Sequence, residues 1–138
     1  MIRIAAVGDV HFDKHSQNRL SEHFMGLESK ADFLLLAGDL TQTGHPDEIQ
    51  ALAHDLKKCP ISVISVLGNH DYHLNMVEEV IDILEEANVT VLDNSSTTLH
   101  INDQSVGIAG AKGFGGGFVG ACGSDFGEPE MKEFMKHS

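Results

Sequence analysis

The stretch ISVISVLGNHD, residues 61–71, decides the fold because an apolar, strand-like run ends there in a glycine followed by metal-binding residue types. Two earlier stretches repeat the pattern: Ile2–Val7 runs into GDVH (8–11), and Phe33–Ala37 runs into GD (38–39). Ligands of an open α/β sheet gather just beyond the carboxyl ends of its parallel strands. Three strands of this kind predict a single crevice that receives all three glycine-led segments.

Helical spacing of apolar residues between these runs indicates that helices alternate with the strands. The faces that this spacing predicts are Leu20-Phe24-Leu27, Ile49-Leu52-Ala53-Leu56 and Val77-Val80-Ile81-Leu84. The second helix opens at Pro46 with an acidic first turn. The third begins at Asn75, where Glu78 completes a variant of the capping box, and ends at Asn88. A strand-helix alternation of this kind predicts right-handed crossovers and a parallel sheet.

The alternation of strands and helices ends after residue 88. Short strands are expected at Val89–Leu92, Thr97–Ile101 and Ser105–Ala109, with antiparallel pairing on a second sheet or an edge. Residues 110–127 hold eight glycines and predict a loop, and Glu128–His137 opens like a helix. The chain shows no linker, so residues 1–138 are expected to form a single α/β domain.

The glycine-rich segment contains Gly115-x-Gly117-x-x-Gly120, which nominally matches a dinucleotide-binding fingerprint. That fingerprint requires a helix directly after the glycines, and the sequence predicts none there. We expect this segment to be either a mobile loop near the crevice, covering substrate, or a plain connection.

Bulk composition sets limits on function. The 138 residues are 41% hydrophobic and 22% charged, as in ordinary globular domains. The net charge of −12 disfavours non-specific binding to duplex nucleic acid, which needs clustered Lys and Arg. No run reaches the roughly 18 apolar residues of a membrane helix, and the N-terminus lacks the features of a signal peptide. We therefore expect a cytoplasmic protein, with Cys59 and Cys122 as reduced thiols.

The first glycine-led segment offers a pair of metal-binding side chains. Asp9 and His11 are two residues apart, so on a continuing strand they would face the same side and could bind one ion. A solvated turn is the ordinary alternative. Asp13-Lys14-His15 repeats the spacing but does not follow a strand, so the first pair is preferred.

The other two segments complete the candidate set. Asp39 follows an apolar run, although a turn or helix N-cap aspartate would look the same. In Asn69-His70-Asp71 an amide oxygen can bind a hard cation, an imidazole can move a proton, and a carboxylate can fix the tautomer of that imidazole. Each segment alone could be an ordinary loop, but the three together favour a metal site.

The motifs GDxH (8–11), GD (38–39) and GNHD (68–71) resemble those of the calcineurin-like metallophosphoesterase superfamily. The resemblance covers the first half of that family's domain. It implies a four-layer α/β/β/α sandwich, of which this chain would hold a parallel β-α-β half followed by antiparallel strands of the second sheet.

The resemblance also implies roles for six residues. Asp9 and His11 would bind the first metal ion, Asp39 would bridge both ions, Asn69 would bind the second, His70 would act at the leaving-group oxygen, and Asp71 would orient His70. The family completes its site with three later histidines, and none of His73, His100 and His137 has the required context. We therefore expect an N-terminal piece of such a domain.

Carboxylate, imidazole and amide ligands without a thiolate suit two divalent ions of Mn, Fe, Zn or Mg. Such ions would attract phosphate to an acidic protein and generate a hydroxide for attack on phosphorus. The expected reaction is hydrolysis of a phosphomonoester or phosphodiester, with a phosphorylated small molecule or nucleotide as substrate. The alternative is a catalytically incomplete fragment that binds one ion or none and depends on self-association or on a partner chain carrying the missing histidines.

Overall fold

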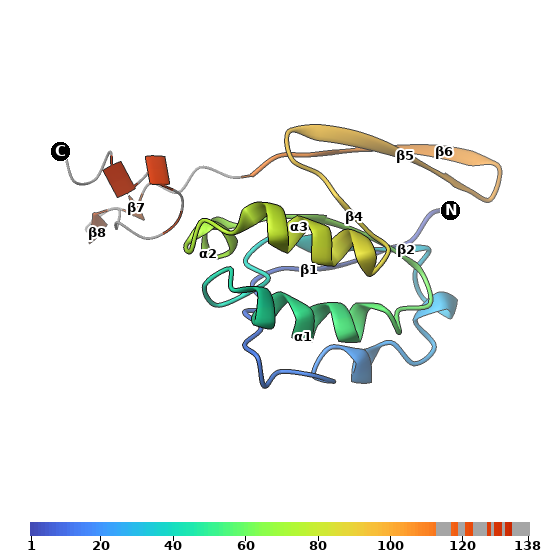
Figure 1. Ribbon diagram of the computed structural model, residues 1–138. Helices are drawn as coiled ribbons and strands as arrows, with labels where there is room; N and C mark the ends of the chain where they lie inside the picture. The colour runs from blue at the N-terminus through green and yellow to red at the C-terminus, as the bar shows by residue number, and fades with distance from the viewer. Residues whose placement is uncertain (113–116, 119–120, 123–126, 128, 131, 134–138) are drawn as a thin grey trace.

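The computed structural model of the chain describes residues 1–112, 117–118, 121–122, 127, 129–130 and 132–133. It contains a parallel sheet, with helices on one face and an antiparallel hairpin on the other (Figure 1). The strands of the parallel sheet are β1 (Ile4–Val7), β2 (Phe33–Ala37), β3 (Ser62–Val66) and β4 (Val89–Val91). The α-helices are α1 (Pro46–Leu56), α2 (Asn69–Tyr72) and α3 (Val77–Glu86). The hairpin strands are β5 (Ser95–Ile101) and β6 (Gln104–Gly110), followed by the short strands β7 (Gly117–Phe118) and β8 (Ala121–Cys122).

The parallel sheet has the strand order β1-β2-β3-β4. The register pairs Val7 with Leu36 and Ala37 with Val66, so the first three strands end at neighbouring positions. Right-handed crossovers between strands added in one direction put the connecting helices on one face. The loops that follow β1, β2 and β3 therefore leave from a common edge of the sheet, as the sequence predicts.

Alternate residues of the central strands serve two hydrophobic layers, because successive side chains of a strand point to opposite faces. Leu34 and Leu36 belong to the cluster on the helix face, whereas Phe33 and Leu35 belong to the cluster on the hairpin face. On the helix face, α1 contributes Ile49 and other apolar residues at helical spacing. No helix in the described part of the chain has both the length and the apolar character needed to cross a bilayer.

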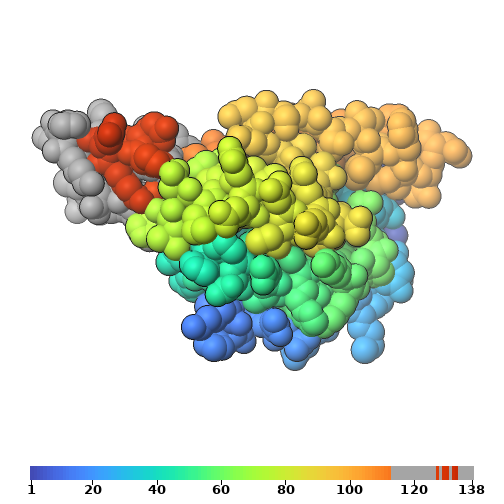
Figure 2. All heavy atoms as spheres, viewed as in Figure 1, coloured from blue at the N-terminus to red at the C-terminus, as the bar shows by residue number. Residues whose placement is uncertain are grey.

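The β5–β6 hairpin forms the third layer. Its inward residues are Leu99, Ile101, Val106 and Ile108, which pack against Phe33, Ile64 and Leu92 of the parallel sheet. In Figure 2 the hairpin is a continuous orange surface, with the yellow and green surfaces of α3 and α1 lying together on the other side of the strands. The layers confirm the predicted α/β class, with a parallel half followed by an antiparallel second sheet.

The helix predicted from Leu20, Phe24 and Leu27 is wrong. Two short 3-10 helices, Ser21–His23 and Leu27–Ser29, take its place. Gly26 has a φ of 71°, a left-handed conformation that separates the two turns. The helical spacing of the apolar residues reflects burial of this connection against the core and not a continuous helix.

Two further expectations need correction. The strand predicted at Val89–Leu92 is β4, and it pairs parallel with β3 instead of joining the antiparallel set. α3 is capped at Met76 without a side-chain hydrogen bond, so the capping box predicted for Asn75 and Glu78 is absent there. Asn88 closes the helix as predicted, with a left-handed φ of 61°.

The end of the chain is described only in part. β7 and β8 pair antiparallel, residues 129–130 and 132–133 are helical, and the rest of the predicted loop and helix lies outside the described residues. Gly127 donates its backbone N–H to His73 Nδ1 at 3.4 Å, and Lys132 Nζ donates to the His73 carbonyl. The described parts of this segment therefore lie against the chain that follows α2.

Candidate metal centre

Three loops meet at the carboxyl edge of the parallel sheet. Residues 8–12, 38–42 and 68–72 are the first, second and third site loops. The backbone N–H of Asp9 donates to the Gly38 carbonyl at 3.1 Å, and the N–H of His11 donates to the Asp39 carbonyl at 3.0 Å. The first two loops thus continue the parallel pairing of β1 and β2 beyond the strands.

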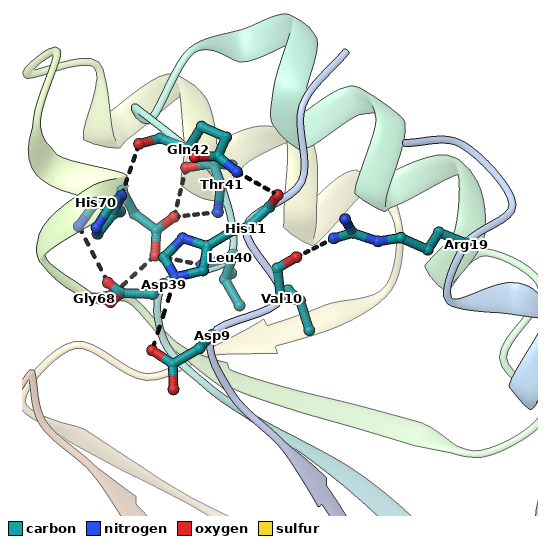
Figure 3. Close-up of polar contacts among 11 residues, drawn as sticks. Asp9, Val10, His11, Arg19, Asp39, Leu40, Thr41, Gln42, Gly68 and His70 are labelled. Atoms are coloured by element: carbon teal, nitrogen blue, oxygen red, sulfur yellow. Dashed lines mark hydrogen bonds and ion pairs between the residues drawn. The ribbon is translucent and has the colours of Figure 1, made fainter. Parts of the chain in front are cut away.

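His11, Asp39 and His70 come together, one from each site loop (Figure 3). Each offers one ligand atom, and the three atoms lie within 4.8 Å of one another. The two imidazole rings meet edge to face, with 4.5 Å between their centroids. The backbone N–H of His70 also donates to Asp39 Oδ1 at 3.1 Å. The arrangement joins the third loop to the carboxylate of the second.

The residues present fit a divalent cation. Two imidazoles and a carboxylate are donors that Zn²⁺, Mn²⁺ and Fe²⁺ accept. His11 Nδ1 is buried and has no hydrogen-bond partner among the described residues, although buried polar atoms are normally paired. This unpaired nitrogen belongs to the ring that comes together with Asp39 and His70, which fits a cluster that binds a ligand.

The backbone of the first two site loops is held in an uncommon conformation. Asp9, His11 and Asp39 have φ values of 53°, 42° and 50°, in the left-handed region that disfavours residues with a side chain. Each such residue costs roughly 1–3 kcal/mol and persists only where its surroundings enforce it, which is common at functional sites. Three of the four metal ligands predicted from sequence are held in this way.

Gly68 allows the third loop to approach the second. A Cβ atom at this position would lie 2.0 Å from Asp39 Oδ1 and 2.4 Å from the Asp39 backbone nitrogen. No side chain fits at those distances unless Asp39 moves. The glycine that begins the third motif is therefore required by the close packing of the site and not by a positive φ.

Asp71 is fully buried and anchors the second and third loops to each other. Its carboxylate accepts hydrogen bonds from Leu40 N (3.1 Å), Thr41 N (2.9 Å), Thr41 Oγ1 (2.7 Å) and Gly68 N (2.9 Å). Burial raises the pKa of Asp71 above its ordinary value, and these hydrogen bonds partly oppose that effect. Asp71 therefore fixes the two loops that carry Asp39 and His70.

The His70 ring is oriented by a backbone carbonyl. His70 Nδ1 lies 2.8 Å from the carbonyl oxygen of Gln42. Because a carbonyl only accepts, Nδ1 must carry the hydrogen, which leaves Nε2 as the nitrogen with a lone pair in the neutral ring. Asp71 binds the loop just before Gln42 and so contributes to this orientation through the backbone. The roles predicted for His70 and Asp71 stay predictions.

Asp9 lies beside the cluster, and Asn69 directly precedes His70 in the chain. The Asp9 side chain is 80% exposed, and its Oδ1 lies 4.0 Å from His11 Nε2. Asn69 is half-buried at the first residue of α2. The structure thus brings His11 and Asp39 together with His70 and leaves Asp9 at the rim. Metal binding by Asp9 and by Asn69 stays a prediction.

The second Asp-x-His sequence, Asp13-Lys14-His15, lies on an exposed turn. Asp13 Oδ1 accepts hydrogen bonds from the His15 backbone N–H at 2.7 Å and from Ser16 Oγ at 3.1 Å. The backbone hydrogen bond from His15 holds the pKa of Asp13 below its ordinary value. The carboxylate is engaged in the turn, which supports the preference for Asp9 and His11.

Several residues that shape the site were not identified from the sequence. Gln42 orients His70 through its carbonyl and also donates its side-chain Nε2 to the His11 carbonyl at 3.0 Å. Arg19 donates to the Val10 carbonyl, within the first loop (Figure 3). No local pattern marks these residues, because each acts on a segment distant in the sequence.

Comparison with known proteins agrees with this geometry. Residues 2–111 match the model of the calcineurin-like phosphoesterase family. The chain belongs to this family. A Caenorhabditis elegans protein named as a metallophosphoesterase is 32% identical over 114 residues, which cover 80% of this chain and 23% of that protein.

A second relative is the symmetrical bis(5'-nucleosyl)-tetraphosphatase of Nitrosococcus oceani. It is 40% identical over 74 residues, which cover 51% of this chain and 24% of that protein. The chain therefore spans about a quarter of the length of either relative. Family membership agrees with the resemblance carried by the three motifs.

Proposed function

We propose that the site loops form part of the metal centre of a phosphoesterase that hydrolyses a phosphomonoester or phosphodiester. The observation that carries this proposal is the convergence of His11, Asp39 and His70 at the carboxyl edge of the sheet. Membership of the calcineurin-like phosphoesterase family supports the same chemistry.

Charge supports a role for metal ions in substrate binding. The chain has a net charge of −12, which would repel a phosphate. Two divalent ions bring about +4, and Asp9 with Asp39 about −2, so the crevice would carry about +2. Mn, Fe, Zn and Mg all suit the ligands, which are His11, Asp39, Asp9 and the amide oxygen of Asn69.

When bound, the ions would polarise the phosphoryl group and make water an effective nucleophile at neutral pH. The chain's own residues would hold and move protons. With its Nδ1–H on the Gln42 carbonyl, a cationic His70 carries a second proton on Nε2. We propose that His70 gives this proton to the departing oxygen, an effect typically worth about 10²- to 10⁴-fold in rate.

The substrate class is proposed as a phosphorylated small molecule or nucleotide. The relative from Nitrosococcus oceani acts, by its name, on a dinucleoside tetraphosphate, so such a compound belongs among the substrates to be tested. Duplex nucleic acid is not an expected partner because of the acidic balance. The cytoplasmic location remains a prediction from the sequence.

The direct test is metal analysis of the purified chain combined with hydrolysis of aryl phosphate monoesters, aryl phosphate diesters and a dinucleoside tetraphosphate in added Mn²⁺. Two ions per chain, and turnover that Asp39→Asn abolishes, would support the proposal. One ion or none, without turnover, would favour the alternative of an incomplete centre that needs a second copy or a partner chain.

A second test separates proton donation by His70 from metal binding by His70. Aryl esters with leaving groups of increasing pKa would be compared in the parent, His70→Asn and the matched variant His54→Asn, whose histidine is exposed on α1. If His70 protonates the leaving group, the loss in His70→Asn grows with leaving-group pKa and the Mn²⁺ affinity is kept. A uniform loss with weakened Mn²⁺ binding would identify His70 as a ligand instead.

A further inference from the structure

The carbonyl group of Val10 lies at the centre of the first site loop. Asp9 and His11, on either side of it, both have a left-handed φ. The next two carbonyls of this loop are held by the second loop, because Gln42 donates its side chain to the His11 oxygen and its backbone N–H to the Phe12 oxygen. The Val10 oxygen receives its hydrogen bond from another source, the guanidinium of Arg19 (Figure 3).

Arg19 makes a second contact with the same loop. Its guanidinium carbon lies 4.4 Å from the centroid of the Phe12 ring, and Phe12 is fully buried. A planar guanidinium can donate from its edge while its face lies on an aromatic ring, which an ammonium group cannot do in the same way. Arg19 therefore contacts the residues immediately before and after His11.

The backbone of Arg19 is itself fixed by a buried carboxylate. Asp55 of α1 is fully buried and accepts hydrogen bonds from the N–H groups of Asn18 (2.6 Å), Leu20 (2.8 Å) and Ser21 (3.1 Å). Lys58 Nζ donates to Asn18 Oδ1 at 2.7 Å. The residues on both sides of Arg19 are thus tied to α1, which packs against the sheet.

We propose that Arg19 is a positioning residue for the metal centre, anchored through Asp55, and that it holds His11 beside His70, where it can share a divalent cation with Asp39. This inference rests on the proposed function. Without the guanidinium, the Val10 carbonyl loses its donor and the Phe12 ring loses its cover. The left-handed backbone at Asp9 and His11 is then free to relax, and the His11 imidazole departs from the cluster.

The test compares Arg19→Ala and Arg19→Lys with the matched control Arg3→Ala. Arg3 is the chain's other arginine; it donates to the Ser29 carbonyl and pairs with Asp32 before the sheet begins. Both alanine variants lose one positive charge and one guanidinium–carbonyl contact. We expect Arg19→Ala to weaken Mn²⁺ binding by about 10- to 100-fold, as loss of a group that orients a metal ligand does. Arg3→Ala should stay close to the parent.

Arg19→Lys tests the geometry of the contact apart from its charge. Lysine retains the charge but not the planar fork, so we expect it to restore only part of the affinity. Should Arg19→Ala fail to fold, Arg19→Lys carries the comparison. Full Mn²⁺ affinity in Arg19→Lys and in Arg19→Ala would overturn the proposal.

A metal-free readout separates this proposal from the proposed function. Imidazole ¹H–¹⁵N NMR signals of His11, and amide exchange at residues 9–11, would be compared between the parent and the variants without metal. Altered His11 signals and faster exchange in Arg19→Ala alone would support the positioning role. If the parent binds no Mn²⁺, the proposed function fails while this readout still decides the role of Arg19; signals identical to the parent's would contradict it.

Discussion

The site loops and the β5–β6 hairpin use the same sheet in different ways. The loops at its carboxyl edge are joined by directed hydrogen bonds, hold three residues with a side chain at positive φ, and pack Gly68 directly against Asp39. The hairpin covers one face through apolar side chains, and a Cβ atom added at Gly107 would meet nothing within 4 Å. The site loops therefore depend on specific geometry at the residues that form the candidate metal centre. The hairpin depends on it only at its two ends, where Asn102 and Asp103 of the turn have a positive φ and a Cβ atom at Gly110 would lie 2.5 Å from Leu92 Cβ.

The largest loss of stability is expected when the hydrogen-bond network of the site loops loses the Asp71 carboxylate. Asp71→Ala would leave the four donors of Leu40, Thr41 and Gly68 without their acceptor in a buried place. We expect the free energy of unfolding to fall by about 3–5 kcal/mol, because several buried donors lose their partner together. Denaturant unfolding measures this loss.

The matched control for that change is Asp82→Ala, which removes an exposed aspartate from α3. It should change the free energy of unfolding by no more than about 0.5 kcal/mol. Equal effects of the two variants would show that the network of Asp71 does not hold the site loops together.

The next effect concerns packing and not hydrogen bonding. Gly68→Ala would place a Cβ atom 2.0 Å from Asp39 Oδ1 and so displace a predicted metal ligand. We expect a loss of about 1–3 kcal/mol in the free energy of unfolding, as for other overpacked positions. Mn²⁺ titration should show a weakened site in the same variant.

Gly107→Ala provides the corresponding change in the hairpin, where the added methyl group meets open space. It should leave Mn²⁺ affinity at the parent's value. A Gly68→Ala protein with intact Mn²⁺ affinity would end the contrast between the two regions.

The sequence predicted those parts of the fold and site that local patterns encode. Apolar runs ending in glycine placed the three site loops at one edge, and residue spacing predicted α1, most of α3 and the hairpin. His11 and Asp39 come together because parallel strands in register end side by side. The periodicity of the apolar residues and the order of the parallel strands are enough to derive these features.

The remaining features depend on contacts between distant segments, which local patterns do not encode. Asp55, on α1, accepts hydrogen bonds from the backbone of residues 18–21 and so fixes the connection that follows the first site loop. Apolar spacing predicts a continuous helix in this connection, but the structure has short 3-10 helices there. The orientation of His70 comes from the Gln42 carbonyl, and a backbone atom leaves no signature in the sequence. The sequence predicts antiparallel pairing for the run at Val89–Leu92, whereas β4 pairs parallel with β3, because a short apolar run is compatible with either pairing.

A third prediction examines the hairpin itself. Leu99→Ala removes a half-buried side chain that packs with the parallel sheet. We expect the free energy of unfolding to fall by about 1–2 kcal/mol, less than for a fully buried leucine. Mn²⁺ affinity should not change, because the hairpin makes apolar contacts with the face of the sheet and the site loops lie at its edge. Thr98→Ala, on the exposed side of the same strand, is the control; a Leu99→Ala protein with weakened Mn²⁺ binding would contradict the separation.

The smallest effect is expected at the amino end of the sheet, opposite the site loops. Asp32 accepts hydrogen bonds from the Arg3 guanidinium at 3.0 Å and from the Arg3 backbone N–H at 2.7 Å, and these hold the pKa of Asp32 below its ordinary value. A carboxyl group whose pKa is lower in the folded state contributes stability above the pKa of the unfolded state. That contribution is lost as the pH falls through the folded-state pKa.

The variant Asp32→Asn removes this titration while keeping the shape of the side chain. We expect it to be slightly less stable than the parent near neutral pH and to approach the parent in acid, because only the parent loses the contribution of the ionised carboxyl group. Denaturant unfolding at a series of acidic pH values measures the difference, which should be small because exposed ion pairs contribute little. A difference in the free energy of unfolding that stays constant with pH would show that the Arg3 pair does not favour ionised Asp32. A change in Mn²⁺ affinity in Asp32→Asn would show that this end of the sheet is coupled to the site loops.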